Sequence, residues 1–238
     1  MLSETMSAEQ YPNQPLIDVA FEIRFPGDPA VECRRDEFFR LVRDRYPKVY
    51  VPKLQPGDAP ALALYHFKQD DEQATIMTAI NKLVYTTKKY PGFEAFKEEV
   101  LRIAAIFGTT CKIEKLTRTG LRYVNAIPFV PKGGSIPLRE YLKVGFQLPP
   151  PATDNFTTMN FTFASQVGNG TIHTRIEHAM AGNKSHEAIL LDFDYAMQSD
   201  LAFDKIETYL EESHSVTKQM FEGMITDEYR NYIRGEEI

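Results

Sequence analysis

Residues 118–126, RTGLRYVNA, form the stretch on which the fold prediction depends. Their alternation of apolar and polar side chains, with an embedded charge, predicts a half-buried β-strand. Residues 17–25, IDVAFEIRF, show the same pattern near the start of the chain. Each stretch runs into a turn that contains proline or glycine, and a helical pattern follows. We therefore expect two copies of one unit that begins with a strand.

The predicted elements occur in the same order twice. The first set is a strand at 17–25, a helix at 31–46, strands at 50–54, 61–69 and 74–87, and a helix at 91–108. The second set is a strand at 111–129, a short helix at 137–144, strands at 156–164, 171–179 and 187–197, and a long helix at 203–225. Segment 74–87 is either one long strand or a hairpin around Asn81-Lys82.

This order predicts an α+β fold, in which two pseudo-repeated strand–helix–three-strand–helix units form an antiparallel sheet with helices on one face. The expected divisions are a flexible arm (1–14), a first repeat (15–110), a second repeat (111–226) and an acidic, fraying tail (227–238). The TATA-binding-protein type of fold is similar in general topology. The alternative is two independent α+β halves joined at 108–113.

Composition limits the class of protein. The chain has 238 residues, of which 43% are hydrophobic, and a formal net charge of −6, which argues against broad binding to nucleic acid. Its two cysteines, Cys33 and Cys111, lack C-x-x-C spacing and indicate a reducing compartment without a zinc site. No apolar run approaches the roughly 18 residues of a membrane span, and residues 1–14 do not look like a signal peptide. We therefore expect a cytoplasmic protein.

Five motifs together resemble a sporadically distributed family of uncharacterised prokaryotic proteins of about this length. They are PLIDVAFEIRF at 15–25, YPGFEAF at 90–96, GLRYVN at 120–125, LLDFDY at 190–195, and a histidine at 214 followed by MFEGMITDE at 220–228. The resemblance covers nearly the whole chain and implies no particular activity. The family often has tryptophan near YPGFEAF, whereas this chain has none, which we interpret as a packing variation. Its patchy distribution implies an association with mobile or defence genes.

Polar side chains of the C-terminal strands are expected to share one surface of the sheet, because side chains alternate between faces along a strand. The set is His173, Arg175, Glu177, Asp192 and Asp194. Carboxylates beside an imidazole are suitable ligands for a divalent cation such as Mg²⁺ or Mn²⁺. The alternative is a solvated polar face with cross-strand ion pairs such as Arg175–Asp192.

A second candidate site lies where the two equivalent strands are expected to meet. It consists of Glu22, Arg24, Arg122 and Asn125. A charge within an apolar strand is costly unless it is paired, so Glu22 and Arg122 are expected to form a structural ion pair. The functional interpretation is a ligand cleft in which Arg24 or Arg122 binds an anion.

These observations favour a non-enzymatic protein that binds a ligand or another protein through the polar face and the presumed seam. The long last helix suggests a homodimer. The alternative is a metal-dependent hydrolase of a phosphate-containing substrate, with His173, Asp192 and Asp194 as metal ligands, Glu177 as general base and Arg175 stabilising the anion. Single-stranded nucleic acid is not an expected partner, because the aromatic side chains of 156–164 are expected to face the core.

Overall fold

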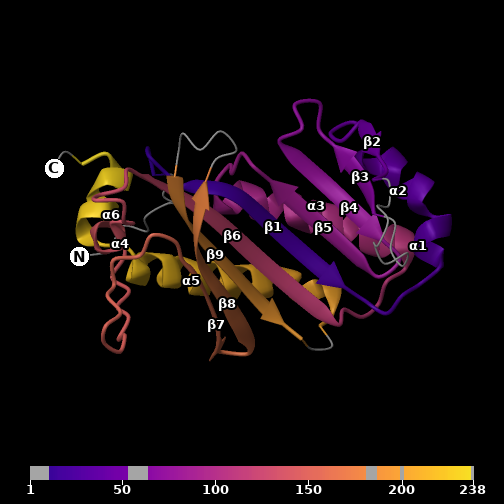
Figure 1. Ribbon diagram of the computed structural model, residues 1–238. Coiled ribbons are helices and arrows are strands. Elements are labelled where there is room, and N and C mark those ends of the chain that lie inside the picture. The colour runs from indigo at the N-terminus through magenta and orange to yellow at the C-terminus, as the bar shows by residue number, and fades with distance from the viewer. Residues whose placement is uncertain (1–10, 53–63, 181–186, 199–200, 237–238) are drawn as a thin grey trace, which may run out of the picture. The chain divides into compact units, whose positions relative to one another are not determined.

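The computed structural model describes residues 11–52, 64–180, 187–198 and 201–236 (Figure 1). The described strands are β1 (Leu16–Arg24), β2 (Lys48–Tyr50), β3 (Tyr65–Lys68), β4 (Ala74–Ala79), β5 (Lys82–Thr87), β6 (Arg118–Phe129), β7 (Asn160–Val167), β8 (Gly170–Met180) and β9 (Glu187–Met197). The helices are α1 (Ala30–Cys33), α2 (Arg35–Val42), α3 (Phe93–Cys111), α4 (Leu138–Tyr141), η1 (Phe203–Lys205), α5 (Ile206–Met224) and α6 (Asp227–Arg234). No helix in these four ranges is long and apolar enough to cross a membrane.

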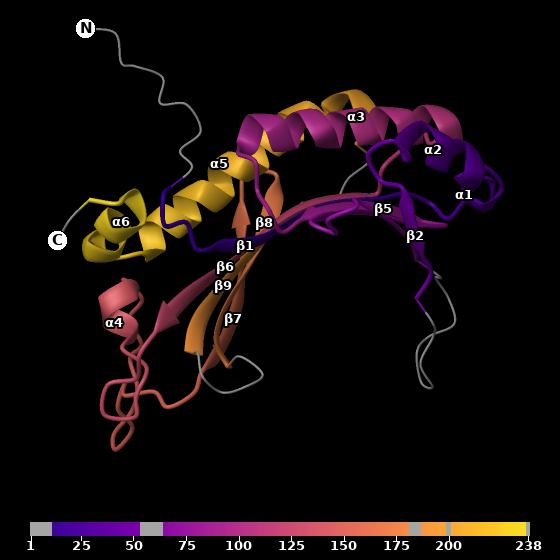
Figure 2. The same cartoon turned by 90° about the horizontal axis from the view of Figure 1, so that it is seen from above.

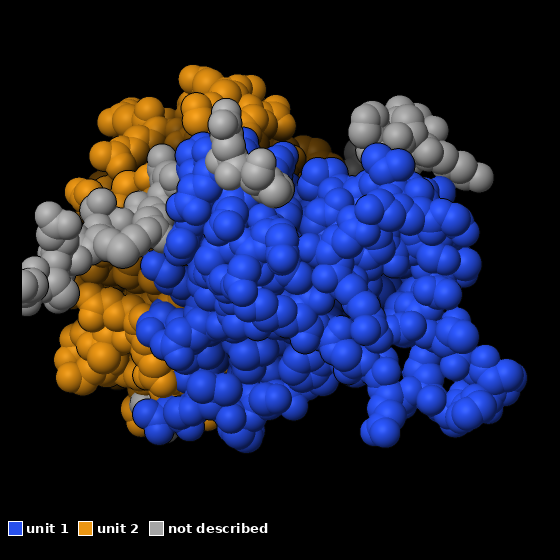
Figure 3. Space-filling model, turned by 90° about the vertical axis from the view of Figure 1, so that its left-hand side faces the viewer, with its two compact units in different colours: residues 1–17, 123–195, 215–238 blue, residues 18–122, 196–214 orange. Residues whose placement is uncertain are grey.

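The strands form one antiparallel sheet, with neighbours in the order β2-β3-β4-β5-β1-β6-β9-β8-β7. The predicted α+β class is confirmed. The chain gathers into two compact units, each built from separate stretches of sequence (Figure 3). Unit 1 comprises residues 1–17, 123–195 and 215–238, and unit 2 comprises 18–122 and 196–214. Each unit therefore draws on both halves of the sequence.

Unit 2 has α2 and α3 on one face of its strands (Figure 2). The ring of Phe107 in α3 lies with its centroid 5.6 Å from that of Phe25 and 5.3 Å from that of Phe38. Alternation along β1 fully buries Val19, Phe21 and Ile23, whereas Ile17, at the start of the strand, is 47% exposed. The same alternation holds in unit 1, where β9 buries Ile189, Leu191, Phe193 and Tyr195.

Segment 74–87 is a hairpin rather than one long strand. β4 and β5 pair from Ala74↔Thr87 to Ala79↔Lys82. Two residues, Ile80 and Asn81, connect the strands, the shortest common hairpin loop. Gly182-Asn183, a dipeptide typical of a hairpin turn between the strands predicted at 171–179 and 187–197, lies outside the described residues.

The helix predicted at 31–46 is wrong in its extent. It is divided at Arg34, whose φ of −107° and ψ of 7° end α1 before α2 begins, and α2 ends at Val42. Leu41, an apolar residue of α2, is 55% exposed. The buried side chains of α2 are Phe38 and Val42, which are four residues apart and lie on one stripe of the helix. That stripe leaves Leu41 facing solvent.

The helix predicted to end at Gly108 continues to Cys111, so Cys111 does not begin the next strand. Lys112 ends α3 in the left-handed conformation, with φ of 55°. Gly108 has a different role, because a Cβ there would lie 2.8 Å from Cε1 of Phe203. Its hydrogen side chain permits the close approach of that ring.

Three other predicted segments also need correction. The expected fraying tail contains the helix α6, and the last residues of the expected arm, from Tyr11, are hydrogen-bonded to the C-terminal segment. The strand predicted at 156–164 begins only at Asn160. Phe161, expected in the core, is 41% exposed, because β7 is an edge strand. The inward-facing prediction, and the argument against nucleic acid built on it, therefore fail at this position.

A partly buried carboxylate links the end of α2 to α3. Glu99 accepts hydrogen bonds from Tyr46 Oη at 2.7 Å and from Arg102 Nη2 at 2.6 Å, and Arg45 lies 2.5 Å away. Burial tends to raise the pKa of Glu99, but the hydrogen bonds from Arg102 and Tyr46 outweigh it and hold that pKa below its ordinary value. Glu99 therefore favours the folded state in its ionised form.

Glu99→Gln is expected to lower the free energy of unfolding at pH 7 by about 2 kcal/mol, because it leaves Arg102 without its charged partner. The contribution of the carboxylate is complete above its unfolded pKa of 4.5 and is lost as pH falls through the lower folded pKa, so the variant and wild type should converge in acid. Urea unfolding between pH 3 and 7 measures this. The exposed Glu98→Gln is the control, expected to stay within about 0.5 kcal/mol. Equal losses in both variants would contradict the assignment.

Candidate binding site

On the predicted polar face, Arg175 is paired with two carboxylates. Arg175 Nη2 donates to Asp192 Oδ2 at 3.1 Å, and Arg175 Nη1 lies 3.3 Å from Glu177 Oε2. Asp192 retains only 10% of its side-chain exposure, and Asp194 lies half-buried on the same side of β9. His173 is exposed, with Ala164 as its neighbour across the β7–β8 ladder.

This arrangement favours the ion-pair interpretation over the metal interpretation. The guanidinium of Arg175 occupies the position beside Asp192 that a divalent cation would need. Among the residues that the structure describes, no group of three or more His, Cys, Asp or Glu side chains has a geometry suited to a metal ion.

The second candidate site is divided between two faces. Glu22 Oε1 accepts from Arg24 Nε at 2.7 Å and from Arg118 Nη1 at 2.7 Å, so Arg118 is a partner that the sequence analysis missed. Arg122 is three residues from Asn125 on β6, so their side chains lie on opposite faces. Asn125 is buried and donates through Nδ2 to the carbonyl of Leu191 at 3.4 Å. These contacts support the structural interpretation of Glu22.

The C-terminal helix α6 forms one wall of a concave site in unit 1. Thr226 caps its N-terminus by accepting from the backbone N–H of Tyr229 at 3.2 Å, and its hydroxyl donates to the carbonyl of Glu140 at 2.7 Å. Gly235 ends the helix in the left-handed conformation, with φ of 71°. Tyr229 and Ile233, four residues apart, are the buried side chains of α6.

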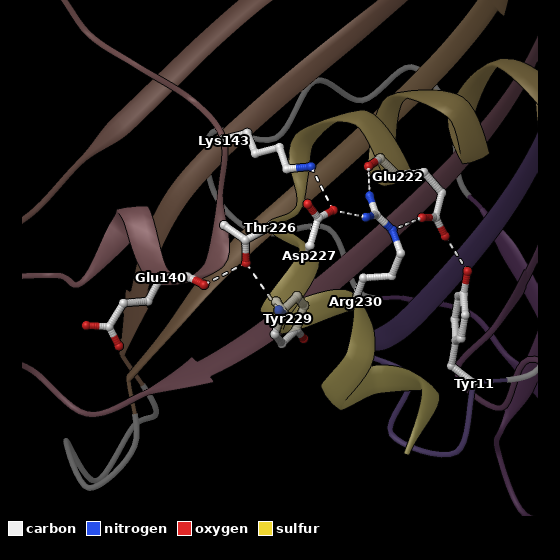
Figure 4. Close-up of polar contacts among 8 residues, drawn as sticks. All are labelled: Tyr11, Glu140, Lys143, Glu222, Thr226, Asp227, Tyr229 and Arg230. Atoms are coloured by element: carbon white, nitrogen blue, oxygen red, sulfur yellow. Dashed lines mark hydrogen bonds and ion pairs between the residues drawn. The ribbon is translucent and has the colours of Figure 1, made fainter. Parts of the chain in front are cut away.

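Ion pairs hold α6 to the end of α5 and to the segment after α4 (Figure 4). Arg230 Nε donates to Glu222 Oε2 at 2.7 Å, and Arg230 also pairs with Asp227. Lys143 Nζ donates to Asp227 at 2.9 Å. Tyr11 donates to Glu222, which brings residues before β1 into the same network. The helix is therefore anchored from three directions.

An aromatic hollow of about 710 Å³ lies between α4 and α6, and we call it the tyrosine pocket. The rings of Tyr141 and Tyr229 meet edge to face at 5.5 Å, and those of Tyr229 and Tyr232 stack at 5.9 Å. Tyr232 is 49% exposed, so it forms an accessible wall. The complete lining is Pro128, Arg139, Glu140, Tyr141, Glu228, Tyr229 and Tyr232.

The surroundings in the pocket keep the hydroxyl groups of Tyr141 and Tyr229 uncharged. Burial, and then the neighbouring Glu140 carboxylate, raise the pKa of Tyr141. Burial, and then the nearby Tyr232, raise the pKa of Tyr229. Both hydroxyls therefore stay protonated at neutral pH. They can donate and accept hydrogen bonds but are poor bases.

This site was not predicted from sequence, because residues 227–238 were expected to form a fraying tail. The available signal was Thr226 before the acidic first turn of 227–228 and Arg234-Gly235 at the other end, a typical pair of helix start and stop signals.

Thr226→Val is expected to lower the free energy of unfolding by about 1–2 kcal/mol, because it removes both the helix cap and the hydrogen bond to Glu140. Hydrogen exchange should accelerate selectively in α6. Denaturant unfolding and amide exchange measure the two effects. Thr158→Val, at an exposed position, is the matched control. Unchanged protection of α6 would show that the cap does not hold the helix.

No family model matches the chain, and no curated protein does. Membership of the sporadic prokaryotic family therefore stays a prediction. Any function has to be argued from the geometry of the chain itself.

Proposed function

We propose that this chain is a non-enzymatic binding protein whose tyrosine pocket holds a positively charged group on an apolar body. The main observation behind this proposal is that stacked tyrosine rings and the carboxylate of Glu228 line the same tyrosine pocket. A ring face attracts a cation by about 0.5–2 kcal/mol, and a nearby carboxylate adds to that attraction.

Charges around the pocket support a cationic rather than an anionic ligand. Arg139 is paired with Asp154, and Lys132 Nζ lies 2.6 Å from Glu140 Oε1. Glu228 is exposed and has no ion-pair partner among the described residues. The uncompensated charge at the pocket is therefore negative. An ammonium or guanidinium group with a hydrocarbon stem matches both the carboxylate and the rings.

The chemistry of the lining supports binding over catalysis. The described lining contains no histidine, cysteine or serine, and its buried tyrosines have raised pKa values. A general base at neutral pH needs a pKa near 7, and a tyrosine with a raised pKa is far from that value. The pocket therefore has suitable groups for recognition and poor ones for proton transfer.

The proposal includes a duplicated scaffold. In the sheet order, β5-β4-β3 extend from β1 on one side, and β9-β8-β7 extend from β6 on the other. A duplication of the strand-first unit accounts for this correspondence. We further propose that this binding protein is linked to mobile or defence genes, as the family resemblance implies.

Choline and its neutral isostere 3,3-dimethylbutan-1-ol test the proposal, because they share a shape and differ in charge. Choline is expected to bind about tenfold more tightly, a difference of about 1.4 kcal/mol that falls within the range of cation–π attraction. Titration followed by amide chemical shifts should perturb residues of the tyrosine pocket. Equal affinity for the two compounds would contradict a cation site.

Two variants locate the site within the pocket. Tyr232→Ala and Glu228→Gln should each weaken choline binding several-fold, since one removes a ring wall and the other the negative charge. Tyr50→Ala is the control, because Tyr50 is 52% exposed and already lies beneath a cation, Lys68, at 5.3 Å. Unchanged affinity for choline in both pocket variants would show that choline does not bind in the tyrosine pocket.

A further inference from the structure

The strand β7 is an open edge of the sheet. It spans eight residues, Asn160–Val167, and pairs on one side with β8. Six of its eight residues are exposed, and the other two are half-buried. An edge strand presents a row of backbone N–H and C=O groups that can pair with another strand.

The register shows which residues present those groups. The N–H of His178 donates to the carbonyl of Met159 at 2.9 Å, so this pair is bonded across the ladder. In an antiparallel pair the bonded residues alternate, so Phe161, Phe163 and Ser165 direct their backbone groups toward β8. The alternate residues direct theirs to the open side, and they are Asn160, Thr162, Ala164 and Gln166.

The edge lacks the features that usually prevent pairing. Natural edge strands are short, charged, bulged or interrupted by proline. The opposite edge of the sheet, β2, fits that description, because it has three residues, begins with Lys48 and is followed by Pro52. β7, NFTFASQV, has no charged residue and no proline. The two edges of one sheet are thus built differently.

We propose that β7 pairs antiparallel with β7 of a second copy of this chain. A strand without charge meets its own copy without electrostatic repulsion, and twofold symmetry places the same bonding residues on both sides. Residues whose backbone groups face outward must bond to each other across the dyad. The central register that satisfies this condition pairs Thr162 with Ala164 and Asn160 with Gln166. The twofold axis then passes beside Phe163.

This register also covers the exposed Phe161 and the half-buried Phe163. Phe163 lies opposite its own copy as a non-bonded pair, in which side chains approach most closely. The ring of Phe161 stands 5.9 Å from that of Phe163 and 4.8 Å from that of Phe146, between ring centroids. Pairing would bring this aromatic cluster beside its copy. Apolar contact between the two copies would therefore stabilise the dimer in addition to the backbone hydrogen bonds.

Light scattering after size exclusion tests the pairing. Wild type is expected to be dimeric at tens of micromolar, and Ala164→Lys should raise the dimer dissociation constant at least about tenfold by placing like charges near the dyad. Thr162→Pro, which removes an outward-facing N–H and leaves the β8 ladder intact, should do the same. Tyr50→Lys, on β2, is the control and should remain dimeric. Circular dichroism checks that each variant is folded.

Cysteine cross-linking tests the register. In a Cys33→Ser background, Phe163→Cys should form an intermolecular disulfide readily, because the two Cα atoms of a non-bonded pair lie about 4.5 Å apart. Ser165→Cys should not, since its copies would be separated by about 13 Å along the strands. A monomeric wild type, a dimer that persists in Ala164→Lys and Thr162→Pro, or equal cross-linking at both positions would each overturn the proposal.

Discussion

Alternation of side chains along antiparallel strands is the constraint on which the rest of this structure depends. The pairing Phe21↔Tyr85 places two buried side chains on the helix-covered face, and the next pair, Glu22↔Val84, falls on the other face. A slip of one residue would exchange these faces and expose the core. The register therefore holds the helices over one surface and leaves the charged side chains of β1 on the other.

The same constraint explains which features could be predicted from sequence. The buried positions of β1 and β9 follow from a period of two, which needs no knowledge of distant residues. The limits of elements depend on tertiary neighbours and were harder to predict. Gly108 has the appearance of a helix end, but Phe203 decides its role from 95 positions away in the chain. Phe161 has the pattern of a core residue, but among the described strands β7 has a neighbour on one side only.

The candidate site was hidden from sequence reasoning for a related reason. The lining of the tyrosine pocket comes from the end of β6, from α4 and from α6, and residues 142–226 separate α6 from the other two. The helix α6 is short and strongly polar and buries only Tyr229 and Ile233, so few apolar residues mark its buried stripe. Ion pairs and a cap hold it in place instead. Residues such as Arg230, which look like ordinary surface charges, thereby position the aromatic wall.

Charge pairing within the chain also explains why the most ionisable surfaces are the poorer binding candidates. Arg175 is held by Asp192 and Glu177, and Glu22 is held by Arg24 and Arg118, so a ligand there must first break bonds that already stabilise the fold. A partner gains more binding free energy at groups that retain unused capacity for hydrogen bonds or ring contacts. The open backbone of β7 and the faces of the pocket tyrosines have that capacity and carry no charge. Recognition by this chain is therefore expected to rely on ring faces, main-chain groups and the carboxylate of Glu228, while its paired charges serve mainly to hold these groups in position.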